Sequence, residues 1–313
     1  MSASGQSRNS LVAEPGQTAH EWLAHDIGHV IRLGRQLHTA FKNADSPSLL
    51  TPAQFAVLLS LSRVPDIDQR TVADLAALDQ STVSQLVRRL IDKDLLTSRA
   101  DPNDARRHIL RASRAAVDLV ESDGRRLRRA DELFLAPLSP AERSWLLTQL
   151  RLIAFSRLPD ASTYQLPESS DGIAIAETNW AFGRLIRLCL QLHDAFWAEE
   201  IGSIVTPVSH TALGVLAGTG PLEQGVLGEA LSLDKASTAG LVSRMERDGL
   251  LEIRLHDGDR RRKVLRLTSR GRDTLKLTAR PFACVSHRLL EPVRPDNRGH
   301  LLDVLRKVTV GRQ

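Results

Sequence analysis

The chain has 313 residues, of which 42% are hydrophobic, 25% charged and only 4% aromatic, a balance that is typical of globular proteins and excludes disordered or fibrous chains. No apolar run approaches the roughly 18 residues that a membrane span requires, and residues 1–17 lack the apolar stretch of a secretion signal. The net charge of +5 favours a polyanionic partner, whereas the few aromatic residues argue against binding of single strands by base stacking. Two cysteines are too few for a disulfide framework, so we expect a cytoplasmic protein.

The second half of the chain repeats the first half. Residues 31–41 read IRLGRQLHTAF and residues 186–196 read IRLCLQLHDAF, which are identical at eight of eleven positions. The same shift of 155 residues carries Thr51-Pro52 onto Thr206-Pro207. A period of this length indicates two whole domains rather than a solenoid. The predicted organisation is a tail at 1–17, a first unit at 18–156, a linker at 157–178 and a second unit at 179–313.

Periodicity and capping signals predict the helices that begin repeat one. Apolar residues at steps of three and four predict a helix over 22–43. Thr51 followed by Pro52 is typical of a helix start, because the hydroxyl caps the helix and proline fits its first turn. A short helix is expected at 71–77, and Asp79 then caps a further amphipathic helix.

The rest of the repeat is predicted to be a hairpin followed by two helices. Short strands at 95–100 and 109–113 flank the polar segment DPNDARRH. A long helix near 114–136 and a last helix at 141–155 complete the repeat. The fold class is therefore mainly α with small β-hairpins, in the order α-α-α-α-β-β-α-α, and this order occurs twice.

The helix that starts at Asp79 follows a short helix and a tight turn, which is the arrangement of a helix-turn-helix. In that motif the second helix enters the major groove of double-stranded DNA. Any surface helix is polar on one face, so the polar residues alone do not distinguish a DNA-binding helix from an ordinary surface helix. The predicted DNA-binding residues of these helices are Gln80, Ser81, Thr82, Ser84, Gln85 and Arg88 in repeat one, and Lys235, Ser237, Ser243 and Arg244 in repeat two.

Each predicted hairpin carries a cluster of arginines. A narrow minor groove attracts inserted arginine side chains, and phosphates attract cations at a fixed distance from the reading helix. A charged run is usually only a solvated turn, but here it follows a helix-turn-helix in both repeats. The sequence therefore predicts binding to double-stranded DNA, with the hairpin residues Arg106, Arg107, Arg260, Arg261 and Arg262 taking part.

The segments 68–96 and 223–251, with the arginine-rich hairpins that follow, resemble the MarR (multiple antibiotic resistance regulator) family of winged-helix regulators. The family's wing pattern, Asp-x-Arg-Arg followed by Leu-Thr-x-x-Gly, is complete in repeat two as Asp259, Arg261, Arg262, Leu267, Thr268 and Gly271. Repeat one keeps Asp104, Arg106 and Arg107 but has Ala112, Ser113 and Ala116 in place of Leu, Thr and Gly. The resemblance implies that Asp104 and Asp259 hold the wing arginines ready for DNA.

The resemblance also implies that the first and last helices of each unit form an interlocked dimerisation domain. Family members are normally homodimers of single units, so two fused units imply one monomeric chain that forms a pseudo-dimer with an approximate two-fold axis. The expected function is a ligand-responsive repressor on a pseudo-palindromic operator.

Many members of the resembled family bind small aromatic or phenolic ligands between the dimerisation helices and the winged helix. The candidates for lining such a crevice are Trp22, His38, Phe41, Trp180, His193 and Phe196. Aromatic residues on such helices are more often part of a plain core, and this alternative stays open.

Several weaker signals point to other functions. Cys189 lies where peroxide-sensing members of the family keep a reactive cysteine, but free cysteine is also among the most buried residues. His25 and His29 have a metal-ligand spacing without a third ligand, so we predict no metal and no cofactor. No catalytic motif occurs, so an enzyme is not expected. The competing interpretation is a duplicated winged-helix scaffold that binds protein, against which the retained wing arginines argue.

Overall fold

The computed structural model describes Leu23 and residues 26–44, 50–76, 78–102, 104–157, 181–256 and 259–309. The predicted tail at 1–17 and the predicted linker from residue 158 onward lie outside these residues. Trp22, His25 and Trp180 lie outside them as well. In the part of the chain that is described, no helix has both the length and the apolar character needed to cross a membrane.

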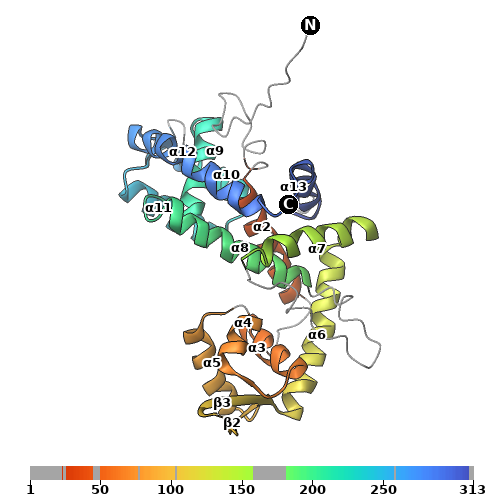
Figure 1. Ribbon diagram of the computed structural model, residues 1–313. Coiled ribbons are helices and arrows are strands. Elements are labelled where there is room, and N and C mark those ends of the chain that lie inside the picture. Colours follow the sequence, from red (N-terminus) through yellow and green to blue (C-terminus); the bar gives the residue numbers. More distant parts are fainter. Residues whose placement is uncertain are drawn as a thin grey trace. The chain divides into compact units, whose positions relative to one another are not determined.

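Both repeats are mainly helical, with one small antiparallel sheet each, which confirms the predicted fold class (Figure 1). The elements of repeat one are α2 (Ile27–Ala44), α3 (Pro52–Arg63), β1 (Ile67–Asp68), α4 (Gln69–Ala76), α5 (Gln80–Ile91), β2 (Leu96–Asp101), β3 (Asp104–Ala112), α6 (Arg114–Phe134) and α7 (Pro140–Ala154). The elements of repeat two are α8 (Ala181–Glu200), α9 (Pro207–Thr219), β4 (Leu222–Glu223), α10 (Gln224–Leu231), α11 (Lys235–Arg247), β5 (Leu251–His256), β6 (Asp259–Leu267), α12 (Ser269–Leu290) and α13 (Pro295–Thr309).

The two sheets share one topology and one register. The strand orders are β1-β3-β2 and β4-β6-β5. Ile67 pairs with Leu110 in repeat one, and Leu222 pairs with Leu265 in repeat two, which is the same pair shifted by 155 residues. The two-residue strands β1 and β4 were not predicted, because two residues show no periodicity. The second hairpin strand was predicted to start at 109 but begins at Asp104, so the wing arginines belong to the strand.

The predicted helix starts are confirmed by hydrogen bonds at their caps. The Thr51 hydroxyl accepts the Gln54 N–H over 3.2 Å, and the Gln54 side-chain oxygen accepts the Thr51 N–H over 2.9 Å. Thr206 caps α9 in the same way, accepting the N–H of Ser209 over 3.2 Å. These bonds satisfy amides that have no partner inside the helix.

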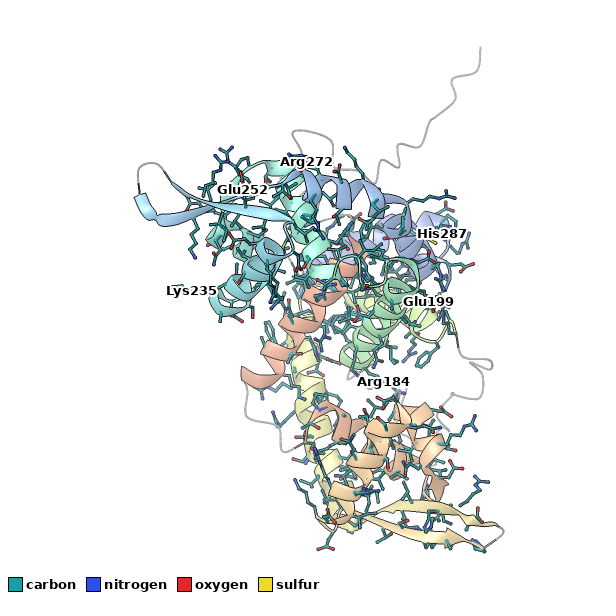
Figure 2. All side chains as sticks on the ribbon, turned by 90° about the vertical axis from the view of Figure 1, so that its left-hand side faces the viewer. Arg184, Glu199, Lys235, Glu252, Arg272 and His287 are labelled. Carbon is teal, nitrogen blue, oxygen red and sulfur yellow. The ribbon has the colours of Figure 1, made fainter. Side chains whose placement is uncertain are left out.

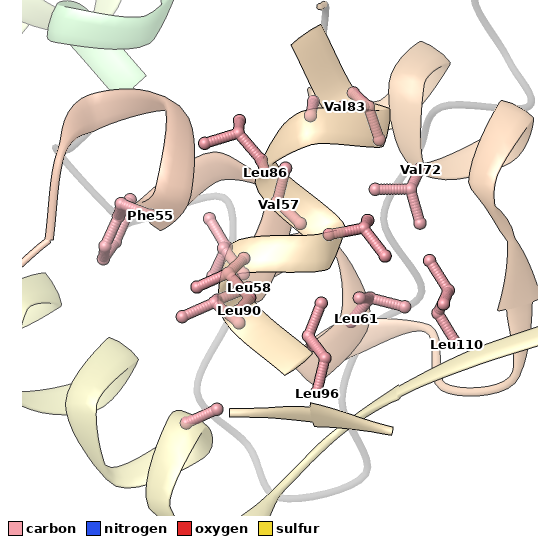
Figure 3. Packing of buried hydrophobic residues seen from close by; sticks show 14 of the residues in the cluster. Phe55, Val57, Leu58, Leu61, Val72, Val83, Leu86, Leu90, Leu96 and Leu110 are labelled. Carbon is pink, nitrogen blue, oxygen red and sulfur yellow. The ribbon is translucent and has the colours of Figure 1, made fainter. Parts of the chain in front are cut away.

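The core of repeat one's winged helix lies between α3, α4, α5 and the sheet (Figure 3). Burial of such side chains is the main favourable contribution to folding. We call α5 and α11, the second helices of the two helix-turn-helix motifs, the reading helices. The reading helix α5 therefore has one apolar face fixed in the core, while its opposite face points away from the core. The buried residues that Figure 3 labels are Phe55, Val57, Leu58, Leu61, Val72, Val83, Leu86, Leu90, Leu96 and Leu110.

The compact units of the structure do not follow the order of the repeats. One unit consists of residues 1–35, 140–154 and 189–313, and the other of residues 36–139 and 155–188. Each unit therefore combines the winged helix of one repeat with the beginning of the first helix of the other repeat. The boundary falls inside α2 and inside α8. The domain boundaries predicted from the sequence remain predictions.

Candidate DNA interface and helical core

An aspartate fixes the start of each reading helix. In repeat one the Asp79 carboxylate accepts the Thr82 N–H over 2.8 Å, the Thr82 hydroxyl over 2.6 Å and the Ser81 hydroxyl over 2.8 Å. In repeat two Asp234 accepts the N–H and the hydroxyl of Ser237 over 2.8 and 2.9 Å. Three of the predicted DNA-binding hydroxyls thus hold the helix start, and any role in contacting DNA comes in addition to that cap.

The other predicted residues of the reading helices lie mostly at the surface. Gln80, Gln85 and Arg88 are exposed on α5, while Ser84 is half-buried. On α11 the exposed residues include Lys235, which Figure 2 shows pointing outward, together with Ser243 and Arg244. Both helices therefore present hydrogen-bonding and cationic groups on the face opposite the core. That these groups touch DNA stays a prediction.

The cap on α5 predicts a measurable dependence of stability on pH. Hydrogen bonds from the Thr82 hydroxyl, the Thr82 N–H and the Ser81 hydroxyl lower the pKa of Asp79 from 3.8 to about 2. A lowered pKa means that the ionised carboxylate stabilises the fold above pH 3.8 and loses this effect as the pH falls towards 2. We expect the free energy of unfolding to fall more steeply between pH 4 and 2 in the wild type than in Asp79→Asn, measured by urea unfolding.

Asparagine also caps helices, so Asp79→Asn keeps α5 folded while removing the titration. Asp92→Asn, at the other end of the same helix, is the control and should follow the wild-type curve. Parallel curves for the wild type and Asp79→Asn over this range would contradict the assignment.

The wings are partly described. The backbone of β3 carries Asp104, Arg106 and Arg107, and the backbone of β6 carries the corresponding acid and arginines of repeat two. The side chains of Asp104, Arg106, Asp259, Arg260, Arg261 and Arg262 lie outside the described part of the structure. Their predicted roles in the wing therefore stay predictions.

Two aspartates that the sequence analysis did not identify bind arginines of the sheet in repeat one. Arg107 donates to Asp68, and Arg111 and Arg99 both donate to Asp66, the latter over 3.3 Å. Asp68 also caps α4, accepting the Thr71 N–H over 2.7 Å. Aspartate is a preferred residue at the N-cap of a helix, but the predicted helix began at 71 and thereby missed Asp68. One carboxylate thus links the wing strand to the helix-turn-helix.

A histidine in the first helix of each repeat packs against a glycine in the first helix of the other. A methyl group at Gly28 would lie 2.2 Å from Nε2 of His193, and one at Gly183 would lie 2.4 Å from Cε1 of His38. Both pairs are related by the 155-residue shift. Because a methyl group at either glycine would overlap the facing histidine ring, the two helices pack closely within each compact unit.

The predicted crevice residues of repeat one lie in an aromatic cluster. His38 is buried and hydrogen-bonded to Asp131. The centroid of its ring lies 5.6 Å from the ring centroids of both Phe134 and Phe182. The ring centroids of Phe41 and Phe134 lie 5.8 Å apart. Burial raises the pKa of Asp131 to about 6, against the effect of His38. Asp131, Phe134 and Phe182 were not identified from the sequence, since they come from two further helices.

The crevice residues of repeat two have different neighbours. His193 is buried, bonds Asp194 over 3.1 Å and lies 5.7 Å from Trp197. Phe196 is buried, and the guanidinium carbon of Arg288 lies over its ring, 4.3 Å from the ring centroid. These aromatic residues pack as core does, and their predicted contact with a ligand remains a prediction.

A buried carboxylate lies in the same compact unit as His193. Asp26 accepts the His29 N–H over 3.0 Å and the Thr211 hydroxyl over 2.9 Å. Burial raises the pKa of Asp26, but His29 and Arg32 outweigh it, so that the net shift is downward from 3.8. Burial lowers the pKa values of His29 and His210 to about 4, so both are neutral at pH 7. This network joins the start of α2 to α9.

Cys189 is packed rather than presented to solvent. Its side chain is 0% exposed, its thiol donates to the backbone oxygen of Leu150 over 3.6 Å, and burial raises its pKa. A reactive thiol needs access and a lowered pKa, so these observations favour the packing interpretation. Among the described residues, no three His, Cys, Asp or Glu side chains gather as metal ligands.

Two copies of a helix-turn-helix followed by a hairpin wing define a tandem winged-helix protein of the DNA-binding class. A family model described as the MarR family matches residues 50–107 and again residues 205–262. The transcriptional regulator HosA of Escherichia coli is 35% identical over 102 residues, which cover 32% of this chain and 73% of HosA. The chain belongs to the MarR family, whose members are DNA-binding transcriptional regulators, and it carries the family's domain twice.

Other relatives have similar coverage. The HTH-type transcriptional repressor NicR of Pseudomonas putida is 29% identical over 130 residues, which cover 41% of this chain and 82% of NicR. Among solved structures, the PcaV transcriptional regulator from Streptomyces coelicolor, in complex with its natural ligand, is 36% identical. The match covers 42% of this chain and 94% of PcaV, with a TM-score of 0.40.

Proposed function

We propose that this regulator is a repressor that binds a pseudo-palindromic operator as one chain and releases it when a small aromatic or phenolic ligand binds. The observation that carries the proposal is the presence of two winged helices with one register in a single chain. Homodimeric relatives need two chains to supply two half-sites, whereas this chain holds both reading helices. Such a regulator acts in the cytoplasm, where the chromosome is.

The make-up of the compact units supports the single-chain pseudo-dimer. Each unit takes its winged helix from one repeat and a segment of the first helix from the other. The His193–Gly28 and His38–Gly183 pairs show close packing between the first helices within each unit. One chain therefore contains both partners of each contact.

Repression and response to a ligand have separate supports. The relative NicR is named a transcriptional repressor, which supports repression here. The ligand is proposed because both compact units hold buried histidines among aromatic rings, a setting that suits an aromatic molecule with polar substituents.

Mass and stoichiometry test the proposal. Analytical ultracentrifugation of the purified protein should give a mass near one chain, 34.5 kDa, and a gel shift with its own upstream DNA should show one chain per operator. A footprint should cover two half-sites in inverted orientation. A stable two-chain particle, or a complex with two chains per operator, would overturn the single-chain proposal.

The wing arginines should supply affinity without choosing the sequence. Arg106→Ala or Arg261→Ala should weaken binding to all DNA and reduce the slope of log affinity against log salt by about one for each lost phosphate contact. Arg151→Ala, an exposed arginine on α7, is the control and should keep the wild-type slope. A changed base preference at constant slope would instead show that the wing reads bases.

A further inference from the structure

Two arginines of repeat two contact the helix-turn-helix of repeat one. Arg184 and Arg187 lie in α8, within the same compact unit as α4 and α5. Figure 2 labels Arg184. The Arg184 guanidinium donates to the backbone oxygen of Leu75, and that of Arg187 donates to the backbone oxygen of Ala76 over 3.3 Å. Leu75 and Ala76 end α4. Both cations therefore bind the helix end where carbonyls have no partner inside the helix and the dipole is negative.

The contact lies directly before the reading helix. Only three residues separate Ala76 from Gln80, the first residue of α5. A fixed end of α4 therefore fixes the start of the turn that aims α5. Burial, followed by the charge of Arg187, lowers the pKa of Arg184 to about 10, so the side chain is still charged at pH 7. Keeping a charge in this half-buried position is unfavourable unless hydrogen bonds compensate, and the carbonyl of Leu75 provides one.

Only one of the two corresponding positions in repeat one carries a different residue type. The shift of 155 residues places His29 at the position of Arg184 and Arg32 at that of Arg187. In that unit the His29 N–H donates to the buried Asp26 carboxylate over 3.0 Å, and the charge of Arg32 acts on the same carboxylate. The turns after α4 and α10 both close through their own backbone, with the Leu78 N–H donating to the oxygen of Ala73 over 3.0 Å and the Leu233 N–H donating to that of Gly228 over 2.9 Å. The two repeats thus differ at Arg184, which has no arginine counterpart in repeat one.

We propose that Arg184 and Arg187 are positioning residues for DNA reading by repeat one. The first helix of repeat two holds the turn that aims α5, so recognition of one half-site depends on two side chains that belong to the other repeat. The inference rests on the proposed function, because it requires α5 to read DNA. It adds a route by which a change in α8 reaches the reading helix of repeat one.

Hydrogen exchange tests the positioning in the absence of DNA. The double variant Arg184→Met/Arg187→Met keeps an unbranched stem at both positions and removes the donors. Amides of residues 78–83 should exchange about tenfold faster than in the wild type, while residues 233–238 of repeat two should keep their rates. The control Arg125→Met/Arg151→Met removes two exposed arginines and should change neither segment. Unchanged exchange at 78–83 in the first double variant would overturn the inference.

Footprinting of the operator tests the consequence for DNA. Gln85→Ala first identifies the half-site that repeat one reads. Arg184→Met/Arg187→Met should then weaken protection of this half-site about tenfold and leave the other unchanged, and Arg184→Lys/Arg187→Lys should recover part of it because lysine keeps a cationic donor. Equal weakening of both half-sites, or none, would overturn the inference. A wild-type protein that protects no DNA would refute the proposed function, whereas the exchange experiment separately decides whether the arginines fix the turn.

Discussion

Gly271→Ala should destabilise the winged helix of repeat two by about 2–3 kcal/mol, although alanine is ordinarily the better helix former. Gly271 lies in the first turn of α12, and its N–H donates to the Thr268 hydroxyl over 3.0 Å. A methyl group there would lie 2.1 Å from the backbone oxygen of Leu250. That oxygen cannot rotate away as a side chain can, and the Thr268 hydroxyl also holds the adjacent Gly249 oxygen at 2.7 Å.

Thermal and urea unfolding measure the effect. The control is Gly225→Ala in α10 of the same winged helix, where a methyl group would meet nothing within 4 Å. This substitution should leave the stability unchanged or raise it by up to about 1 kcal/mol, the helix preference of alanine over glycine. A melting temperature for Gly271→Ala at or above that of the wild type would show that the close approach does not limit this position.

The same position shows what the sequence could reveal and what it could not. The family resemblance includes a glycine at 271, but the sequence does not reveal its physical reason, which is the backbone oxygen of Leu250 directly before β5. Nothing in the structure explains why repeat one has alanine at the matching position 116. The helix starts at Thr51 and Asp79 were predictable because a cap depends on residues three positions apart. Local signals of this kind gave most of the fold.

Contacts between distant segments carried no such signal. The wing strand β3 extends to Asp104 through a polar, arginine-rich stretch, which lacks the apolar alternation that predicts strands. Asp131 and Arg184 reach their partners only after helices pack together. Repetition of the sequence predicts that two equivalent units exist. It does not predict that a segment of each first helix packs into the unit of the other repeat.

Gly28→Ala should also destabilise the protein, by about 1–3 kcal/mol, and the loss should disappear once His193 is shortened. A methyl group at position 28 would lie 2.2 Å from Nε2 of His193, a buried ring that also bonds Asp194. In the His193→Ala background this space is open, so Gly28→Ala should be neutral or stabilising there, as expected for alanine in a helix. The double-mutant cycle should therefore give a coupling free energy of about 2 kcal/mol.

The cycle has a partner in the other compact unit, formed by Gly183→Ala and His38→Ala, where a methyl group would lie 2.4 Å from Cε1 of His38. Gly299→Ala, which meets nothing within 4 Å on α13, is the common control and should show no coupling to either histidine. If both cycles couple and the protein still sediments as one chain, then residues of repeat one must pack against residues of repeat two in that same chain. Coupling that depended on protein concentration would instead place the two helices in different chains, and the single-chain pseudo-dimer would be wrong.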